Sequence, residues 1–189
     1  MGRLCIAPSS VFLTFVACLL LILASVSCVS KSVDSISFLN ADFSNGTINF
    51  GALAYTGSGR HVGYDFPNGV VPNMSPFTGD YFHVLTGFMI LHPIAAGFTG
   101  VGFIVGTLGL IFRSPIAAGF MTYLSILASS LIFIALCFDL GLWIYVRNQI
   151  RHQGIHAELG KAVWFTLSAY IINMLAYILG ACAVVEIAN

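Results

Sequence analysis

Four long stretches of this chain carry no charged side chain, and this feature limits the fold more than any other. The stretches are positions 4–30, 81–112, 114–138 and 162–185. Each can cross a bilayer as a helix, because a hydrocarbon core of about 30 Å needs roughly 20 helical residues and a charge at its centre is costly. We therefore predict an all-α membrane protein with a four-helix transmembrane bundle. The expected spans are about 9–29, 83–111, 116–140 and 162–185.

The composition agrees with a lipid environment. Of the 189 residues, 58% are apolar and only 7% are charged, too few to cover a water-soluble globule with polar surface. The net charge is zero and there is no basic cluster, so no nucleic-acid partner is expected. We expect one four-span membrane domain over residues 1–189, with the lipid bilayer as its surroundings.

The first stretch has two interpretations. Arg3, the apolar run Val11–Ala24 and the small residues up to Cys28 also fit a cleaved signal peptide. A retained helix is favoured, because the apolar character continues to Val29, beyond the roughly 7 to 15 residues of a signal core. Under both interpretations, the loop that follows lies on the extracellular or lumenal side of the membrane.

That loop, about 30–81, is the one sizeable polar segment. It holds two glycosylation sequons, at Asn45 and Asn73, which suit an extracellular face; Pro76 makes the second a poorer acceptor. Polar and apolar residues alternate over 35–38 and 47–50, on either side of an Asn-Gly turn pair. A small antiparallel β-sheet in the first extracellular loop is expected.

The charges flanking the spans give a mixed signal on orientation. With both termini inside, most Lys and Arg residues fall outside, against the usual bias. The first helix usually dominates, and Arg3 with the terminal amine stands there against Lys31, Asp34 and Asp42. We favour both termini inside and the first loop outside.

Small residues recur in two spans at helical spacing. Gly102 and Gly106 form a GxxxG in the second span, and Ala176 and Gly180 repeat the spacing in the fourth. Such residues let helix backbones approach closely in lipid. They predict helix packing, either inside this bundle, where the two helices could pack together, or against another membrane protein.

The histidines are the candidate pH-responsive groups, because imidazole titrates near pH 6.5. His92 precedes Pro93, which favours a kink and leaves a carbonyl for water or a neighbouring helix to satisfy. His92 is either a titrating switch or a neutral, hydrogen-bonded interior group. His83 lies on the proposed outer side.

The third apolar run ends at Asp139, which we expect at the membrane interface rather than buried. Trp143 and Tyr145 would form an aromatic belt, with Arg147 and Arg151 beyond it on an extended helix. The alternative is a proton- or ion-handling carboxylate, as in a small transporter.

The sequence contains no GxSxG, HExxH or CxxC motif and no phosphate-binding glycine loop before a basic residue. His152 and His156 have a spacing that can bind metal, but no further ligand is evident, and solvated loop histidines are favoured. We expect no enzyme activity, catalytic residue, cofactor or metal. The five cysteines lie in or beside the apolar stretches, so no loop disulfide is expected.

Three segments carry a family resemblance: Phe50–Tyr55, Val62–Tyr64 and Leu91–Gly97, which opens the glycine-rich span. Together they resemble the PalI-type fungal membrane proteins and their eisosome-associated relatives, over nearly the whole chain. The resemblance implies four spans and a large first extracellular loop, an arrangement similar to claudins. PalI-type proteins assist a seven-helix plasma-membrane sensor of alkaline pH, whose signal passes through an arrestin-like protein to a cleaved transcription factor.

The chain departs from the family pattern in two places. Relatives commonly carry cysteines in the first loop, where this chain has Thr56 after Tyr55 and no cysteine. Many also continue into a long hydrophilic tail, whereas this sequence ends at Asn189, so no function of such a tail is carried over.

The favoured function is a non-enzymatic plasma-membrane accessory protein. It would stabilise or assist a partner membrane protein such as a seven-helix pH sensor, in ambient-pH signalling or cortical membrane-domain organisation. The alternatives are a claudin-like structural protein that assembles as a homo-oligomer, and a small transporter in which Asp139 or His92 faces an aqueous path.

Overall fold

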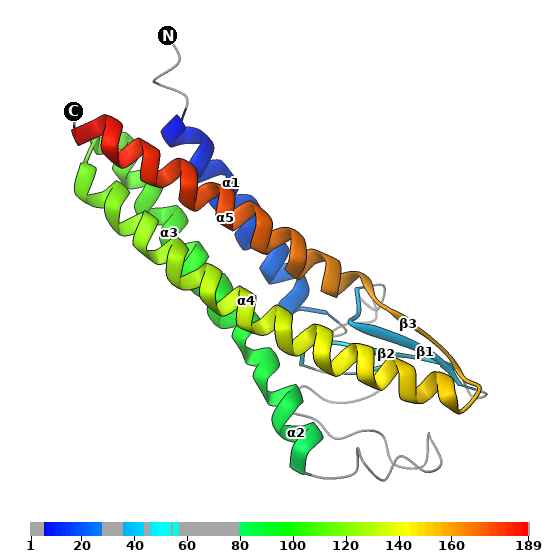
Figure 1. Cartoon of the computed structure of the whole chain (residues 1–189). Helices are drawn as coiled ribbons and strands as arrows, with labels where there is room; N and C mark the ends of the chain where they lie inside the picture. The colour runs from blue at the N-terminus through cyan, green and yellow to red at the C-terminus, as the bar shows by residue number, and fades with distance from the viewer. Residues whose placement is uncertain (1–5, 28–35, 44–45, 54, 57–79, 189) are drawn as a thin grey trace. The chain divides into compact units, whose positions relative to one another are not determined.

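The computed structural model describes residues 6–27, 36–43, 46–53, 55–56 and 80–188 (Figure 1). The helices in this part of the chain are α1 (Ile6–Ser25), α2 (Asp80–Gly87), α3 (Leu91–Phe112), α4 (Pro115–His152) and α5 (Lys161–Ala188), with a 3-10 turn, η3 (Phe88–Ile90), before α3. The strands are β1 (Leu39–Phe43), β2 (Gly46–Phe50) and β3 (His156–Leu159). Four segments are long and apolar enough to cross a membrane: Ala7–Ser25, His83–Phe112, Pro115–His152 and Lys161–Val185. The predicted fold class, four membrane helices with a small sheet, is confirmed.

The chain forms two compact units. Unit 1 comprises Met1–Ile22, Pro93–Phe133 and Thr166–Asn189, and unit 2 comprises Leu23–His92 and Ile134–Phe165. Helices α1, α3, α4 and α5 contribute residues to both units.

Unit 1 is an antiparallel arrangement of four helices. The start of α1, the end of α3, the start of α4 and the end of α5 together line one hollow. The apolar core of unit 1 contains Leu21, Ala95, Ile132 and Ala169, whereas large hydrophobic side chains on its helices are exposed. Ile116, for example, is 83% exposed. In water such exposure would favour aggregation, whereas lipid solvates these side chains.

Unit 2 contains a three-stranded antiparallel sheet with the strand order β2-β1-β3. Strand β2 lies where the sequence predicts it. The first predicted strand, at 35–38, is displaced: position 35 lies outside the described residues, and 36–38 precede β1, although the backbone of Phe38 still bonds to Phe50 and to Gly160. The alternating burial of Leu39 and Ala41 instead defines β1.

Strand β3 comes from the connection between α4 and α5, which the sequence interpretation treats as a solvated loop. Gly154, at φ +78°, turns the chain after α4, and residues 156–159 then pair with β1. The first loop therefore supplies two strands and the second polar connection supplies the third.

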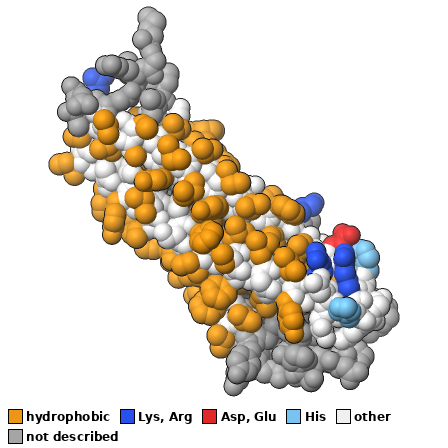
Figure 2. All heavy atoms as spheres, viewed as in Figure 1, with side chains coloured by type: hydrophobic (Ala, Val, Ile, Leu, Met, Phe, Trp, Pro, Cys, Tyr) orange, Lys and Arg blue, Asp and Glu red, His pale blue; other side chains and the backbone are white. Residues whose placement is uncertain are grey.

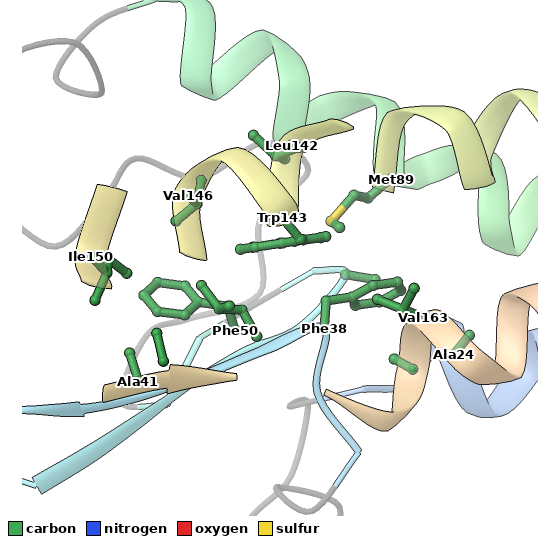
Figure 3. Packing of buried hydrophobic residues seen from close by; sticks show 14 residues of the cluster. Ala24, Phe38, Ala41, Phe50, Met89, Leu142, Trp143, Val146, Ile150 and Val163 are labelled. Atoms are coloured by element: carbon green, nitrogen blue, oxygen red, sulfur yellow. The ribbon is translucent and has the colours of Figure 1, made fainter. Parts of the chain in front are cut away.

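The buried face of the sheet covers an aromatic core (Figure 3). Trp143 of α4 is fully buried, with its ring centroid 6.2 Å from that of Phe38 and 5.8 Å from that of Phe50. The expected place of Trp143 in an aromatic belt is therefore wrong, although α4 does extend to His152 past both arginines. Phe38 and Phe50, from the first loop, enclose the indole in protein.

The other face of the sheet is polar and exposed. His156 lies 3.4 Å from a carboxylate oxygen of Asp42 and 3.6 Å from one of Glu158, and all three side chains are more than half exposed. On the face drawn in Figure 2, hydrophobic side chains cover the helices, whereas charged and histidine side chains gather near the end of α4 and the sheet.

Candidate functional site

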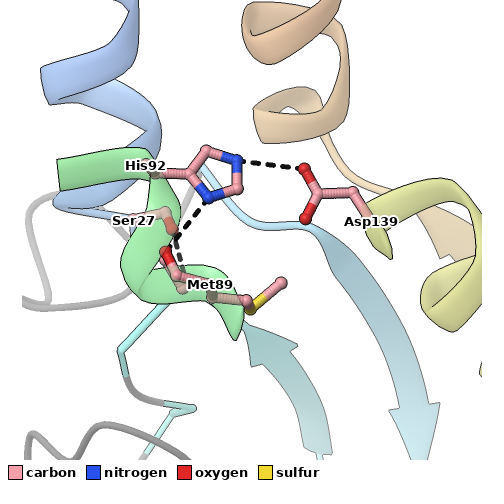
Figure 4. Close-up of polar contacts among 5 residues, drawn as sticks. Ser27, Met89, His92 and Asp139 are labelled. Carbon is pink, nitrogen blue, oxygen red and sulfur yellow. Dashed lines mark hydrogen bonds and ion pairs between the residues drawn. The ribbon is translucent and has the colours of Figure 1, made fainter. Parts of the chain in front are cut away.

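The site begins at the irregular turn before α3. In a continuous helix the residue at position 93 would donate its N–H to the carbonyl of Met89, but proline has no N–H. A buried carbonyl in a membrane segment needs another donor. The Nδ1 atom of His92 lies 3.1 Å from this oxygen, so the ring beside the proline supplies a side-chain donor to a carbonyl that the N–H of Leu91 also approaches (Figure 4). The sequence predicts water or a neighbouring helix in this role.

The other ring nitrogen of His92 faces a carboxylate from α4. Its Nε2 lies 3.0 Å from Oδ2 of Asp139, and the two side chains are 0% and 2% exposed. The expectation that Asp139 is interfacial rather than buried is therefore wrong. Burying this carboxylate is tolerable because its partner is a hydrogen-bonding, ionisable ring.

Aromatic side chains pack against one side of the His92–Asp139 pair. Phe38 meets the imidazole edge-on, with a centroid distance of 5.3 Å and an interplanar angle of 70°, and its ring also stacks on Trp143. Ser27, after α1, accepts a hydrogen bond from the backbone N–H of Ala52 at 2.9 Å. The pair is thus packed against the loop segment that leads into the sheet.

The GxxxG residues of α3 lie inside unit 1. A Cβ atom on Gly102 would lie 3.6 Å from Leu124, and one on Gly106 would overlap the Met121 side chain and lie 3.1 Å from Val11. These contacts come from α1 and α4. The glycine face of α3 therefore packs against α1 and α4 within unit 1.

The small residues of α5 approach the same two helices. Ser10 of α1 donates to the carbonyl of Ala176 at 2.8 Å, and a Cβ atom on Gly180 would lie 3.1 Å from the Ser10 hydroxyl and 3.0 Å from that of Thr122. Asn173, fully buried, donates its side-chain amide to the Ser125 carbonyl of α4 at 3.0 Å. The small-residue faces of α3 and α5 are therefore each turned toward α1 and α4.

The remaining candidate residues lie apart from the pair. His83 is exposed on α2, and its backbone carbonyl accepts the Thr86 hydroxyl. His152 ends α4 and His156 opens β3, so a turn separates them. Asn45 and Asn73, the predicted glycosylation sites, lie outside the described residues. In the described part of the chain, no cluster of three or more His, Cys, Asp or Glu side chains is arranged to hold a metal ion.

The pairing of His92 with Asp139 is not predicted from the sequence. They are 47 positions apart, and Asp139 stands at the end of an apolar run, where a solvated carboxylate is the usual outcome. The available signal was that both lie toward the same side of the membrane in adjacent antiparallel spans.

Comparison with known proteins supports the resemblance. A search of curated proteins finds no match. The model of the SUR7/PalI family matches residues 6–176. The match includes the whole of α1, α3 and α4 and about the first half of α5. The predicted relationship to the PalI-type proteins is confirmed, and the chain belongs to the SUR7/PalI family.

Proposed function

We propose that this protein is a non-enzymatic accessory protein of the plasma membrane that stabilises or assists a partner membrane protein. Its role would be in ambient-pH signalling or cortical membrane-domain organisation, with a seven-helix pH sensor as the partner that the family relationship favours. Both termini would lie inside, and the first loop would lie outside and carry a glycan on Asn45.

The observation that carries this proposal is the construction of the sheet in unit 2. Two polar segments of the chain combine into one sheet whose buried face rests on Trp143 and whose other face presents Asp42, His156 and Glu158. The aromatic core makes this polar face a firm platform. The rim of a protein–protein interface is polar and solvent-accessible, so an exposed polar face held on a packed core can form part of such a contact.

A pull-down experiment tests the proposal. The tagged chain would be purified from membranes in mild detergent and the co-purifying membrane proteins identified. We expect one multi-span partner to be recovered, and the triple change Asp42→Ala, His156→Ala, Glu158→Ala to reduce its recovery several-fold. Asn148→Ala is the matched control, because Asn148 is exposed on α4 in the same unit but outside the sheet.

Two results would contradict the proposal. Equal partner recovery with the triple variant would exclude the polar sheet face as the contact. Recovery of large assemblies of this chain alone would favour the claudin-like alternative instead. The transporter alternative needs an aqueous path to Asp139 or His92, and both side chains are buried in the structure.

A further inference from the structure

The His92–Asp139 pair needs a proton between its facing atoms. A carbonyl oxygen only accepts, so Nδ1 of His92 must carry the hydrogen that it donates to Met89. Without a second proton, Nε2 would present a lone pair to a carboxylate that also has only lone pairs. At 3.0 Å the arrangement therefore requires one more proton, carried by the imidazole or by the carboxyl group.

From this geometry we propose that His92 and Asp139 form a proton-dependent latch in unit 2. The latch holds the first turn of α3 against α4 while the shared proton is present, and it releases when that proton leaves. Released, the ring and the carboxylate become two buried groups whose lone pairs repel, a state that favours separation and hydration. This inference goes beyond the accessory role and does not depend on it.

The elements packed around the pair bring mainly uncharged groups to it. Phe38 precedes β1, Met89 lies in η3, Trp143 lies one turn after Asp139 on α4, and Ala24 and Val163 represent α1 and α5 in the same core. The other described titratable or charged side chains of unit 2 are exposed or half-buried: Asp42, Tyr55, His83, Cys137, Tyr145, Arg147, Arg151, His152, His156, Glu158 and Lys161. Among the side chains that the structure describes in this unit, Asp139 is thus the buried titratable group that lies against His92.

The sign of the pH effect follows from the proton count. The closed latch holds one more proton than the open latch, so higher pH favours opening. In the pH range where the shared proton dissociates, each further pH unit raises the ratio of open to closed molecules by up to about tenfold. Because Phe38 contacts both His92 and Trp143, opening would loosen the aromatic core beneath the sheet.

Tryptophan fluorescence can detect this event in the purified full-length chain. The protein has two tryptophans: Trp143, fully buried in the core, and Trp164, which is 59% exposed. In the Trp164→Phe variant Trp143 is the sole reporter. We expect its emission to move to longer wavelength, and its quenching by acrylamide to increase several-fold, as the pH is raised from about 5 to 10.

Variants of the pair decide whether the latch causes this transition. In Asp139→Asn the side-chain amide donates to Nε2 without a shared proton, so the transition should disappear while helical content is kept. His83→Gln, an exposed histidine of the same unit, should leave the transition unchanged. His92→Gln is a second test, because its amide can donate to the carboxylate, and it replaces Asp139→Asn if that variant fails to fold.

Three outcomes would overturn the inference. One is a flat Trp143 signal across the pH range, and another is an unchanged transition in a folded variant of the pair. The third is loss of the transition in His83→Gln, which would assign it to that histidine. No partner protein is used in this experiment, so its failure is distinguishable from failure of the proposed accessory role.

Discussion

Of the residues around the candidate site, Pro93 has the largest effect on its geometry, because proline has no backbone N–H to donate. The Met89 carbonyl lacks the helical donor at position 93 and accepts Nδ1–H of His92 beside the N–H of Leu91, and this hydrogen bond turns Nε2 toward Asp139. The His-Pro dipeptide thus sets the direction in which the ring hydrogen points.

Glycine packing in unit 1 gives a prediction at this scale. Gly106→Leu should lower the free energy of unfolding by about 1 to 3 kcal/mol, because its side chain would overlap Met121 and Val11. Thermal unfolding in detergent would measure the loss. Gly97→Leu is the matched control in the same helix, since no heavy atom lies within 4 Å of a Cβ atom built there. Equal stability of the two variants would contradict the predicted packing.

A second glycine prediction concerns the junction between β3 and α5. A Cβ atom on Gly160 would collide with the backbone carbonyl of Ser37, so Gly160→Ala should destabilise unit 2 by about 1 to 3 kcal/mol. Gly141→Ala on α4 should be nearly neutral, because that position is open. Trp143 emission during denaturation would report both variants, and a neutral Gly160→Ala would show that the junction can shift freely.

At the scale of elements, the sheet is closed at both edges by its own chain. Arg151 of α4 donates its Nε–H to the Ala157 carbonyl of β3 at 2.7 Å. On the opposite edge, the backbone of Asn49 bonds to Thr56, with its N–H donating to the hydroxyl and its carbonyl accepting the Thr56 N–H. Such closure protects a strand edge from pairing with another chain.

Removing the arginine should open one edge. Arg151→Ala should cost about 1 kcal/mol and speed hydrogen exchange at β3, because the Ala157 carbonyl loses its donor. Arg147→Ala serves as the control, since the described side-chain bonds of Arg147 go to its neighbour Asn148. Hydrogen exchange followed by mass spectrometry would compare them; similar protection of β3 in both variants would show that Arg151 does not seal this edge.

Elements with a strong periodic signal are the ones that the sequence predicts correctly. The four spans and strand β2 follow from long apolar runs and from polar–apolar alternation. Strand β3, His156–Leu159, alternates polar and apolar residues like the two predicted segments, but no strand partner adjoins it in sequence, and its pairing with the distant β1 decides that it is a strand. Trp143 is misplaced because Phe38 and Phe50, distant in sequence, decide its burial.

At the scale of the whole molecule, pairing of β1 with β3 constrains the topology. The first loop and the α4–α5 connection must lie on the same side of the membrane, because their strands share hydrogen bonds. The turn at Arg113, between α3 and α4, must lie on the opposite side if each long helix crosses once. Four spans with both termini on one side satisfy this requirement.

Cysteine labelling on intact cells would check this topology. In a background without native cysteines, Thr47→Cys and Glu158→Cys should both react with a membrane-impermeant maleimide, because both positions are exposed in the sheet. Ser114→Cys should react only after permeabilisation. Labelling of Ser114→Cys on intact cells, with the sheet positions protected, would reverse the proposed orientation.

The β1–β3 pairing also determines when the sheet can be completed during biosynthesis. Leu39 and its partner Leu159 are about 120 residues apart, so at roughly 5 to 20 residues per second a ribosome needs about 6 to 24 s to progress from one to the other. Throughout this interval β1 and β2 can form only a hairpin with one unpaired edge. If the loop faces the lumen, folding factors there meet the incomplete hairpin first, and arrival of the last polar segment ends their access to it.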